Sequence, residues 1–316
     1  MKFDSIPGMI EPAEQELLYE VSKALDLSKK YSIVELGSFF GKSTNSIIHG
    51  LNDNSTNEGS VFHVYDSFKC QRNGNLAQHV VGFSEKFKVN HLLKEEGNSI
   101  DFLDVFKFYT ANKFDNLKIH QNELLDSLYP NKAKIAFLFI DAPKFYDEFY
   151  DVLKIFFLHL DVGSKVIFQD FFFHWSGTVI PAIEIMFQRK LISFEKTAAS
   201  SLLITIEKKI NKDEVRKIND FYQKSTLSDL IQSIYERLSS KKIDRHNYFL
   251  NRLIMAKIQV MVKNESNLDG AKKLSISTFN KIGKIDPQSA KLLEYDLQHF
   301  FKNNFDLQKL YNLDHL

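Results

Sequence analysis

The chain has 316 residues, of which 44% are hydrophobic, and its 41 Lys and Arg residues nearly balance its 40 Asp and Glu residues. A formal net charge of +1 provides no strong basic field for nucleic acid or an anionic membrane. No stretch reaches the ~18 uninterrupted apolar residues of a membrane span, and the single cysteine, Cys70, cannot form an internal disulfide. We therefore expect a cytoplasmic protein with neither a nucleic-acid partner nor a membrane span.

Up to about residue 207 the chain alternates short apolar runs with amphipathic segments. The spacing of leucine and valine predicts a first helix over residues 11–29. An apolar strand then leads through a glycine-containing turn into a helix that begins near Lys42. The strands expected in this part cover residues 33–36, 61–65, 117–120, 135–140 and 165–168, and the later helices cover 145–160 and 178–190.

Residues 69–113 interrupt this alternation. They are polar and contain glycine at first, and a helical pattern follows over 99–109. Because long structureless loops inside a domain are usually lids or binding loops, we predict a helix and an insertion that lies over the functional site.

Two further strands, at 194–197 and 202–206, are separated by only four residues and predict a hairpin. Strands that alternate with helices indicate a parallel, doubly wound α/β sheet, and the hairpin adds an antiparallel edge. From Asn211 onward strand signals vanish and apolar residues recur at helical spacing. We predict one α/β domain over 1–210 and an all-helical domain over 211–316, which forms a homodimer interface or caps an acceptor pocket.

The segment GSFFGKST, which follows the strand at 33–36, is similar to a phosphate-binding loop. The phosphate-binding pattern has four residues between its glycines, whereas three separate Gly37 from Gly41. Glu35 also places an acid where phosphate oxygens would lie. A dinucleotide-binding pattern is disfavoured as well, because its second glycine is replaced by Phe39.

What remains is an acid, a turn with widely spaced glycines, and a second acid at the end of the next strand. Asp66 at that strand end can accept both ribose hydroxyls of an adenosine. Glu35 beside the turn suits a ligand with a positive charge. Adenosine combined with positive charge and without phosphate describes S-adenosylmethionine.

The chain resembles the class I S-adenosylmethionine-dependent methyltransferases, in the branch of sugar and macrolide O-methyltransferases (methyltransferase family 24 and cephalosporin-hydroxylase-like proteins). The resemblance covers residues 8–207 and rests on GMIEPAEQELL, VELGSFFGKST, VYDSF, IHQNELLDSL and FLFIDAPKFYDEFYDVLKIFF. It implies a Rossmann-like sheet and a cofactor site. The methionine part would lie along Glu35, Gly37, Ser38, Gly41 and Ser43, the ribose at Asp66, the adenine near Asn122, and Asp141 would adjoin both cofactor and acceptor.

The predicted catalytic residues follow the fourth and fifth strands. Asp141 and Asp170 would lie at the sheet edge where α/β proteins bind ligands, and two carboxylates there could hold Mg²⁺ or act as a base. In the sugar methyltransferases that the chain resembles, a His stands where this chain has Lys144, and Gln169 replaces one acid. Lys144 could supply a fixed positive charge or a base, or it could simply pair with Asp141. His174, with Trp175, could stack on the acceptor, or these aromatic side chains could simply pack within their loop.

These features predict an S-adenosylmethionine-dependent O-methyltransferase. Its acceptor would be a hydroxyl of a saccharide or another small metabolite, as in polysaccharide biosynthesis. Two alternatives stay open: a nucleoside-binding protein that has lost turnover, and a protein with a phosphate-binding loop.

Overall fold

A computed structural model describes residues 6–29, 31–122, 129–130, 133–173, 176–243 and 245–285. The chain divides into two compact units. The first comprises residues 1–169 and 190–216, and the second comprises 170–189 and 217–316. The predicted domain boundary at residue 210 stays a prediction.

A seven-stranded sheet forms the centre of the first unit, with strand order β6-β2-β1-β7-β8-β10-β9. The strands are β6 (Leu117–Gln121), β2 (Val61–Asp66), β1 (Ser32–Leu36), β7 (Ile135–Ile140), β8 (Leu160–Phe168), β10 (Ser201–Ile206) and β9 (Ile192–Ala198). Neighbours from β6 to β8 are parallel, whereas β10 is antiparallel to both β8 and β9. This confirms the predicted α/β fold with a mostly parallel sheet and a closing hairpin.

The apolar runs of the sequence become the innermost strands. Every residue of β1 and of β7 is buried, as expected for parallel strands that are covered on both faces. The chain moves outward from β1 through β2 to β6 and then returns to β7 on the other side of β1. In open α/β sheets, ligands bind at such a reversal of strand order, outside the carboxyl ends of the strands.

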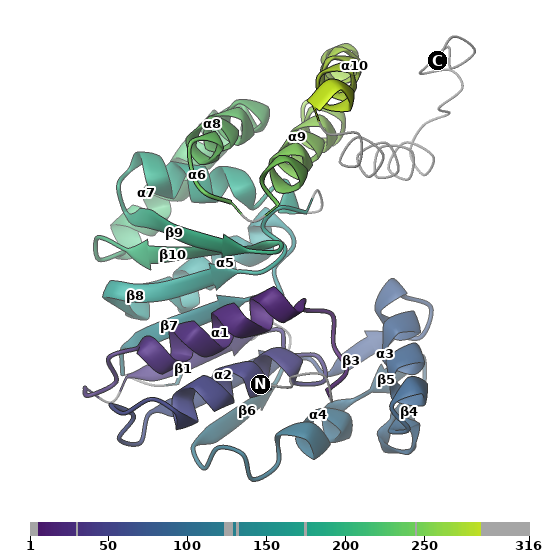
Figure 1. The fold of residues 1–316 in the computed structure, drawn as a ribbon, viewed down its shortest axis with the longest axis vertical. Coiled ribbons are helices and arrows are strands. Elements are labelled where there is room, and N and C mark those ends of the chain that lie inside the picture. Colours follow the sequence, from purple (N-terminus) through teal and green to yellow (C-terminus); the bar gives the residue numbers. More distant parts are fainter. Residues whose placement is uncertain are drawn as a thin grey trace. The chain divides into compact units, whose positions relative to one another are not determined.

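Helices α1 (Pro12–Ala24) and α2 (Lys42–Asn52) lie next to each other in front of the sheet (Figure 1). Helix α1 starts with a proline and a capping box between Glu11 and Glu14, which satisfies backbone donors at its N-terminus. At Gly50 of α2 an added Cβ would meet the carbonyl oxygen of Tyr19 at 2.4 Å. A glycine at this position therefore allows the two helices to approach closely.

Between β2 and β6 the insertion is more ordered than expected. It contains a three-stranded antiparallel sheet of order β3-β5-β4 and two helices. These elements are β3 (Lys69–Gln71), α3 (Asn75–Lys86), β4 (Lys94–Glu96), β5 (Ser99–Asp101) and α4 (Leu103–Thr110). The helix expected at 99–109 begins only at Leu103, because the three residues before it pair as β5. Strands of three residues are too short to produce a readable alternation.

The remaining helix of the first unit's fold is α5 (Tyr146–Ile155), which follows β7 and ends before a single 3₁₀ turn at Phe157–His159. Strand β8 begins five residues earlier than the predicted strand at 165–168, and its first part, which includes residues 161–163, is irregular where the pairing register with β7 shifts. Gly163 has a φ of 90° there, which favours glycine.

The second unit is helical and contains α6 (Ile180–Gln188), α8 (Leu227–Ser239), α9 (His246–Lys263) and α10 (Leu268–Ile285). Helix α7 (Lys212–Lys224) begins in the last residues of the first unit. Glu184 of α6 is buried and accepts two hydrogen bonds from the Arg237 guanidinium of α8, at 2.7 and 2.9 Å. Such a two-pronged pair fixes the two helices with respect to each other.

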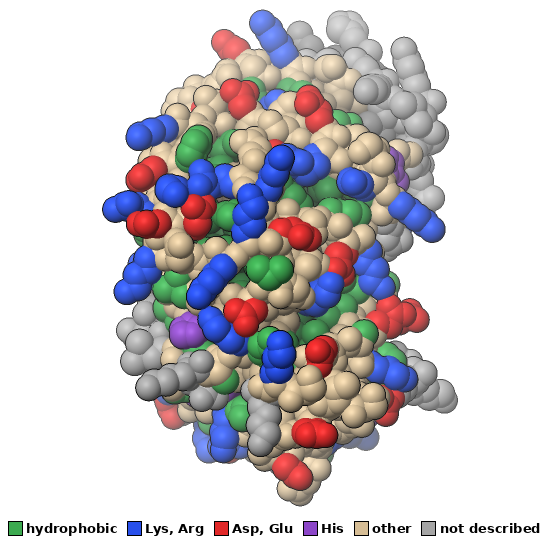
Figure 2. All heavy atoms as spheres, turned by 90° about the vertical axis from the view of Figure 1, so that its left-hand side faces the viewer, with side chains coloured by type: hydrophobic (Ala, Val, Ile, Leu, Met, Phe, Trp, Pro, Cys, Tyr) green, Lys and Arg blue, Asp and Glu red, His purple; other side chains and the backbone are tan. Residues whose placement is uncertain are grey.

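The helical tail is confirmed as far as residue 285, and the rest of it lies outside the described residues. A search of the described helices finds none that is long and apolar enough to cross a membrane. On the face shown in Figure 2, Lys and Arg side chains are interspersed with Asp and Glu.

Candidate active site

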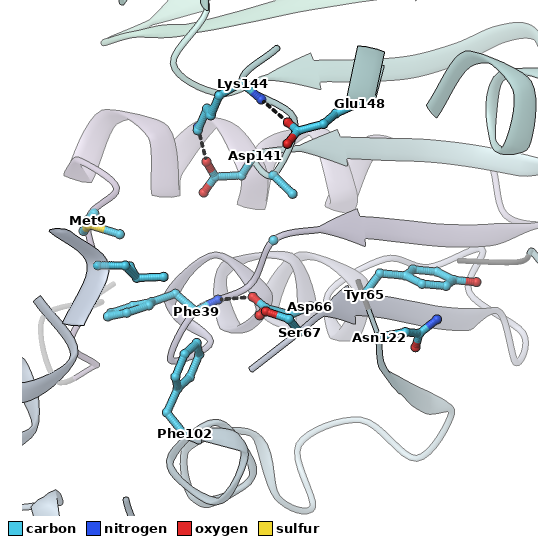
Figure 3. Close-up of a pocket in the computed structure, with 13 residues that line it drawn as sticks. Met9, Phe39, Tyr65, Asp66, Ser67, Phe102, Asn122, Asp141, Lys144 and Glu148 are labelled. Carbon is cyan, nitrogen blue, oxygen red and sulfur yellow. Dashed lines mark hydrogen bonds and ion pairs between the residues drawn. The ribbon is translucent and has the colours of Figure 1, made fainter. Parts of the chain in front are cut away.

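A cavity of about 300 Å³ lies at the carboxyl ends of β1, β2 and β7 in the first unit (Figure 3). The turn after β1 contributes Gly37 and Phe39, and the end of β2 contributes the segment 65–67. The other lining residues come from the ends of β6 and β7, the insertion, α5 and the N-terminal segment: Asn122, Asp141, Ala142, Lys144, Glu148, Leu76, Phe102 and Met9. The cavity therefore occupies the place where the strand order reverses.

The turn after β1 requires both of its glycines. Gly37 and Gly41 have φ values of 85° and 89°, a region that strongly favours glycine. A Cβ added at Gly37 would lie 2.9 Å from the backbone nitrogen of Ala142, at the end of β7. The turn and the end of β7 are thus in direct contact, and a side chain at position 37 would collide with the backbone of Ala142.

The polar residues of GKST have partners that a phosphate-binding loop would not give them. The Lys42 ammonium donates to the carbonyl oxygen of Ile10 at 3.0 Å, and the Ser43 side chain hydrogen-bonds to Glu35. In a phosphate-binding loop these two side chains would face phosphate and its magnesium ion. The phosphate-loop alternative is therefore not favoured.

Asp66 is the organising acid of the turn. Its Oδ2 atom accepts hydrogen bonds from the backbone N–H groups of Ser38 and Phe39 at 2.8 and 2.9 Å, and its Oδ1 accepts one from Phe68 at 2.7 Å (Figure 3). Burial raises the pKa of the Asp66 carboxyl, and the three backbone donors oppose that rise. Both lone pairs of Oδ2 are thus engaged, whereas Oδ1 has a further lone pair, so the group retains acceptor capacity through Oδ1.

Glu35 is fully buried beneath the turn and is not among the residues that line the cavity. Its Oε1 atom has no hydrogen-bond partner among the described residues. Burial raises the pKa of Glu35 to about 8; hydrogen bonds from Ser43 and Thr44 oppose this rise, and the negative charges of Asp141 and Asp66 add to it. Three acids at the ends of neighbouring strands thus share one electrostatic environment, which favours a bound cation.

The end of β7 carries an ion pair. The Lys144 ammonium lies 2.8 Å from Oδ1 of Asp141, and both side chains are about 30% exposed. The backbone N–H of Lys144 donates to Glu148 at 3.0 Å, which holds the ion pair at the cavity wall. The sequence therefore placed Lys144 correctly beside Asp141.

This pairing bears on the predicted magnesium ion. An ammonium group at 2.8 Å partly neutralises Asp141, and no cluster of three or more His, Cys, Asp or Glu side chains suited to a metal occurs in the part of the chain that the structure describes. The residues around Asp141 in the first unit do not fit Mg²⁺, which prefers several oxygen ligands. Asp170 belongs to the second unit, where its carbonyl accepts hydrogen bonds from Phe173 and Ser176, and its pairing with Asp141 at a metal stays a prediction.

Of the predicted cofactor-binding residues, four line the cavity: Gly37, Asp66, Asn122 and Asp141. The others, Glu35, Ser38, Gly41 and Ser43, form the wall behind it. Ser38 acts through its backbone N–H, and Gly41 caps α2 in a left-handed conformation. The predicted catalytic residue His174 and its neighbour Trp175 lie outside the described residues.

Aromatic lining residues were missed by the sequence reasoning. Phe39 stacks on Phe40 with ring centroids 4.1 Å apart, and the ring of Phe102 lies 5.6 Å from that of Phe39. The sequence offered one indication that Phe39 lines the site: it stands between the two glycines of the turn that follows β1. These rings give the cavity an apolar wall opposite Asp141.

A pair of histidines lies behind the cavity on β2 and β6. Nδ1 of His63 and Nε2 of His120 are 2.9 Å apart, and the ring of Tyr65 stacks on His120 with centroids 4.2 Å apart. Tyr65 in turn lines the cavity. Burial lowers the pKa of His63 to about 4, with smaller contributions from His120 and Lys118, and burial also lowers the pKa of His120.

No protein-family model matches the chain, and no curated protein matches it. Similar solved structures are O-methyltransferases. They include the O-methyltransferase NovP, with 15% identity, 64% of this chain and 82% of that chain covered, and a TM-score of 0.44. An O-methyltransferase from Bacillus cereus in complex with SAH has 15% identity, coverages of 64% and 84%, and a TM-score of 0.39. CalS11, a TDP-rhamnose 3'-O-methyltransferase of calicheamicin biosynthesis, has 15% identity, coverages of 61% and 76%, and a TM-score of 0.39. These values describe a partial likeness of fold. The function proposed below is therefore argued from the site residues of this chain.

Proposed function

We propose that the chain is an S-adenosylmethionine-dependent O-methyltransferase. The observation that carries this proposal is the set of three acids, Glu35, Asp66 and Asp141, at the ends of adjacent strands around a cavity with a glycine turn. Lys144 is the cation among the described lining residues, and it is paired with Asp141. Such a cavity favours an adenosine that carries a positive charge over one that carries phosphates.

Each part of the cofactor has a corresponding group in the cavity. Asp66 would accept the ribose hydroxyls, the Gly37 turn would adjoin the methionine part, and Tyr65 and Asn122 would flank the adenine. When bound, the sulfonium group supplies an activated methyl group, so positioning accounts for most of the catalysis.

At the acceptor end, Asp141 and Lys144 have complementary roles. The Asp141 carboxylate would accept a hydrogen bond from the acceptor hydroxyl and take its proton as the oxygen–methyl bond forms and the carbon–sulfur bond breaks. The ammonium of Lys144 would hold Asp141 in place and stabilise negative charge on the acceptor oxygen. The acceptor is a hydroxyl of a saccharide or another small metabolite.

The experiment that tests the proposal is calorimetry with S-adenosylhomocysteine and with ATP, followed by a methyl-transfer assay on a panel of saccharides and phenols. We expect S-adenosylhomocysteine to bind and ATP not to bind. Asp141→Asn should lower kcat by at least about 100-fold, the lower end of what a positioned base contributes. Cofactor affinity should change less, and Asp151→Asn on the exterior of α5 serves as the matched control. ATP binding without S-adenosylhomocysteine binding would overturn the proposal, and binding without turnover would favour a non-catalytic protein.

The buried acid Glu35 makes cofactor affinity depend on pH. In the free protein its pKa of about 8 keeps it protonated at pH 6, whereas a cationic ligand favours the ionised form and lowers that pKa. Binding should therefore release a proton, and S-adenosylmethionine affinity should rise by about fivefold from pH 6 to pH 8, within the limit of tenfold per pH unit for one proton. Calorimetry in two buffers with different ionisation enthalpies measures the released proton.

Glu35→Gln is the control for this effect, because it keeps the shape and removes the titration. The variant should show no proton release at pH 7, and its affinity should vary with pH only through the ligand. Equal proton release by the variant and the wild type would show that Glu35 is not the group involved.

A further inference from the structure

Lys42, the lysine of GKST, has a side chain directed away from the turn and toward the N-terminal segment. Its ammonium donates a hydrogen bond to the carbonyl oxygen of Ile10 at 3.0 Å. Its aliphatic stem lies against Gly8, where an added Cβ would come within 2.7 Å of the Lys42 Cβ. Residues 6–10 therefore cross the start of α2 in close contact with this one side chain.

The position of Lys42 is electrostatically unfavourable for the helix itself. It is the first residue of α2, where the helix dipole favours acids, and the first turn of α2 contains no acid. A lysine at this position does not stabilise the helix start. Its hydrogen bond to Ile10 instead attaches the N-terminal segment to the start of α2.

The attached segment forms part of the cavity wall. Ile10 is buried, and Glu11 after it begins the capping box of α1, so the segment is anchored at this end. Met9 is 51% exposed and lines the cavity beside Phe39 (Figure 3). Met9 thus lies between two residues that contact Lys42: Gly8, which packs on its stem, and Ile10, which accepts its hydrogen bond.

We propose that Lys42 is a positioning residue, which holds residues 6–10 across the cavity so that Met9 forms part of the wall against the bound cofactor. This inference rests on the proposed function. Loss of the hydrogen bond from Lys42 to Ile10 would weaken the attachment of the segment to the start of α2. The cofactor would then bind to an open site, and the entropy lost in ordering the segment would reduce the binding free energy.

The test uses the full chain with ¹³C-methyl methionine, which gives five signals, one for each methionine. The variant Lys42→Met keeps the stem that packs on Gly8, removes the donor and adds a sixth methionine signal, which is recognised by its absence from the wild-type spectrum. In the ligand-free protein we expect its Met9 signal to sharpen and move toward the random-coil position, while the signals of Met186, Met255 and Met261 stay unchanged. Met9→Leu assigns the signal, and Lys154→Met on α5, an exposed lysine, is the matched control.

Calorimetry with S-adenosylhomocysteine provides the second measurement. Lys42→Met should weaken binding by about fivefold, the effect of one net hydrogen bond, and Lys42→Arg should restore most of the affinity. A Met9 signal that is the same in Lys42→Met and the wild type would overturn the inference. An affinity within about twofold of the wild type, the spread expected for surface substitutions, would also overturn it. If the wild type fails to bind S-adenosylhomocysteine, the proposed function fails, and the ligand-free spectra still decide whether Lys42 holds the segment.

Discussion

Replacing Asp66 with alanine should weaken S-adenosylhomocysteine binding by at least about 100-fold, or 2.7 kcal/mol. The expected loss has two sources. The variant removes the acceptor proposed for the ribose hydroxyls, and it leaves the backbone N–H groups of Ser38, Phe39 and Phe68 without the carboxylate that now holds them. Hydrogen bonds to a charged group contribute about 1.5–3 kcal/mol each, so either loss alone is substantial. Calorimetry measures the affinity directly.

The variant Asp66→Asn separates the two sources. Asparagine keeps one carbonyl oxygen for the turn and loses the charge, so we expect an affinity between those of the wild type and the alanine variant. Asp213→Ala, at an exposed position on α7, is the control. An Asp66→Ala protein that binds S-adenosylhomocysteine as tightly as the control would contradict the proposed role of the carboxylate.

The buried His63 should make the protein sensitive to mild acid. Its pKa is about 4 in the folded chain and 6.5 in its ordinary state, so the unfolded chain binds the proton more readily between these values. Stability is therefore complete above pH 6.5 and falls as the pH drops toward 4. The shift corresponds to about 3 kcal/mol of unfolding free energy, to be measured by urea denaturation at pH 7, 5.5 and 4.5.

His63→Phe tests the source of this acid sensitivity. Phenylalanine fits the aromatic surroundings of Tyr65, Tyr129 and His120 and carries no titrating group. The variant should lose much less stability than the wild type between pH 7 and pH 4.5. His79→Phe on α3 is the matched control and should behave like the wild type. If the His63→Phe protein and the wild type lose stability in parallel, the acid sensitivity arises elsewhere in the chain.

The sequence predicted the central sheet well, because parallel strands buried on both faces leave continuous apolar runs such as Ile135–Ile140. It predicted the insertion poorly. Strands β3, β4 and β5 have three residues each, and their pairing depends on contacts between residues up to 32 positions apart, as between Lys69 and Asp101. Such pairing leaves no local periodicity that could be read from the sequence.

The acidic residues of the candidate site could be predicted from the sequence, but the hydrogen bonds that join the site residues to the backbone could not. Asp66 and Asp141 were found because they end apolar strands. Lys144 was noted because it stands where the methyltransferases that the chain resembles have a His, and its ion pair with Asp141 was one of the roles considered. That Asp66 binds the turn through backbone N–H groups could not be inferred, since it depends on the conformation of Phe39, whose φ is 50°. The contact of Lys42 with Ile10 depends in the same way on the path of the N-terminal segment.

The pairing of β3 with β5 gives the insertion the character of a replaceable module. Lys69 in β3 is paired with Asp101 in β5, so the chain leaves and rejoins the main fold at neighbouring positions on adjacent strands, about 5 Å apart. The residues between them include Leu76 in the cavity wall, and a replacement segment would have to fill the buried positions of Ala77, Val80 and Val89 in the core that β2 shares. Selectivity at this wall can therefore change through one continuous stretch of sequence, without any change in the strands that carry the acids.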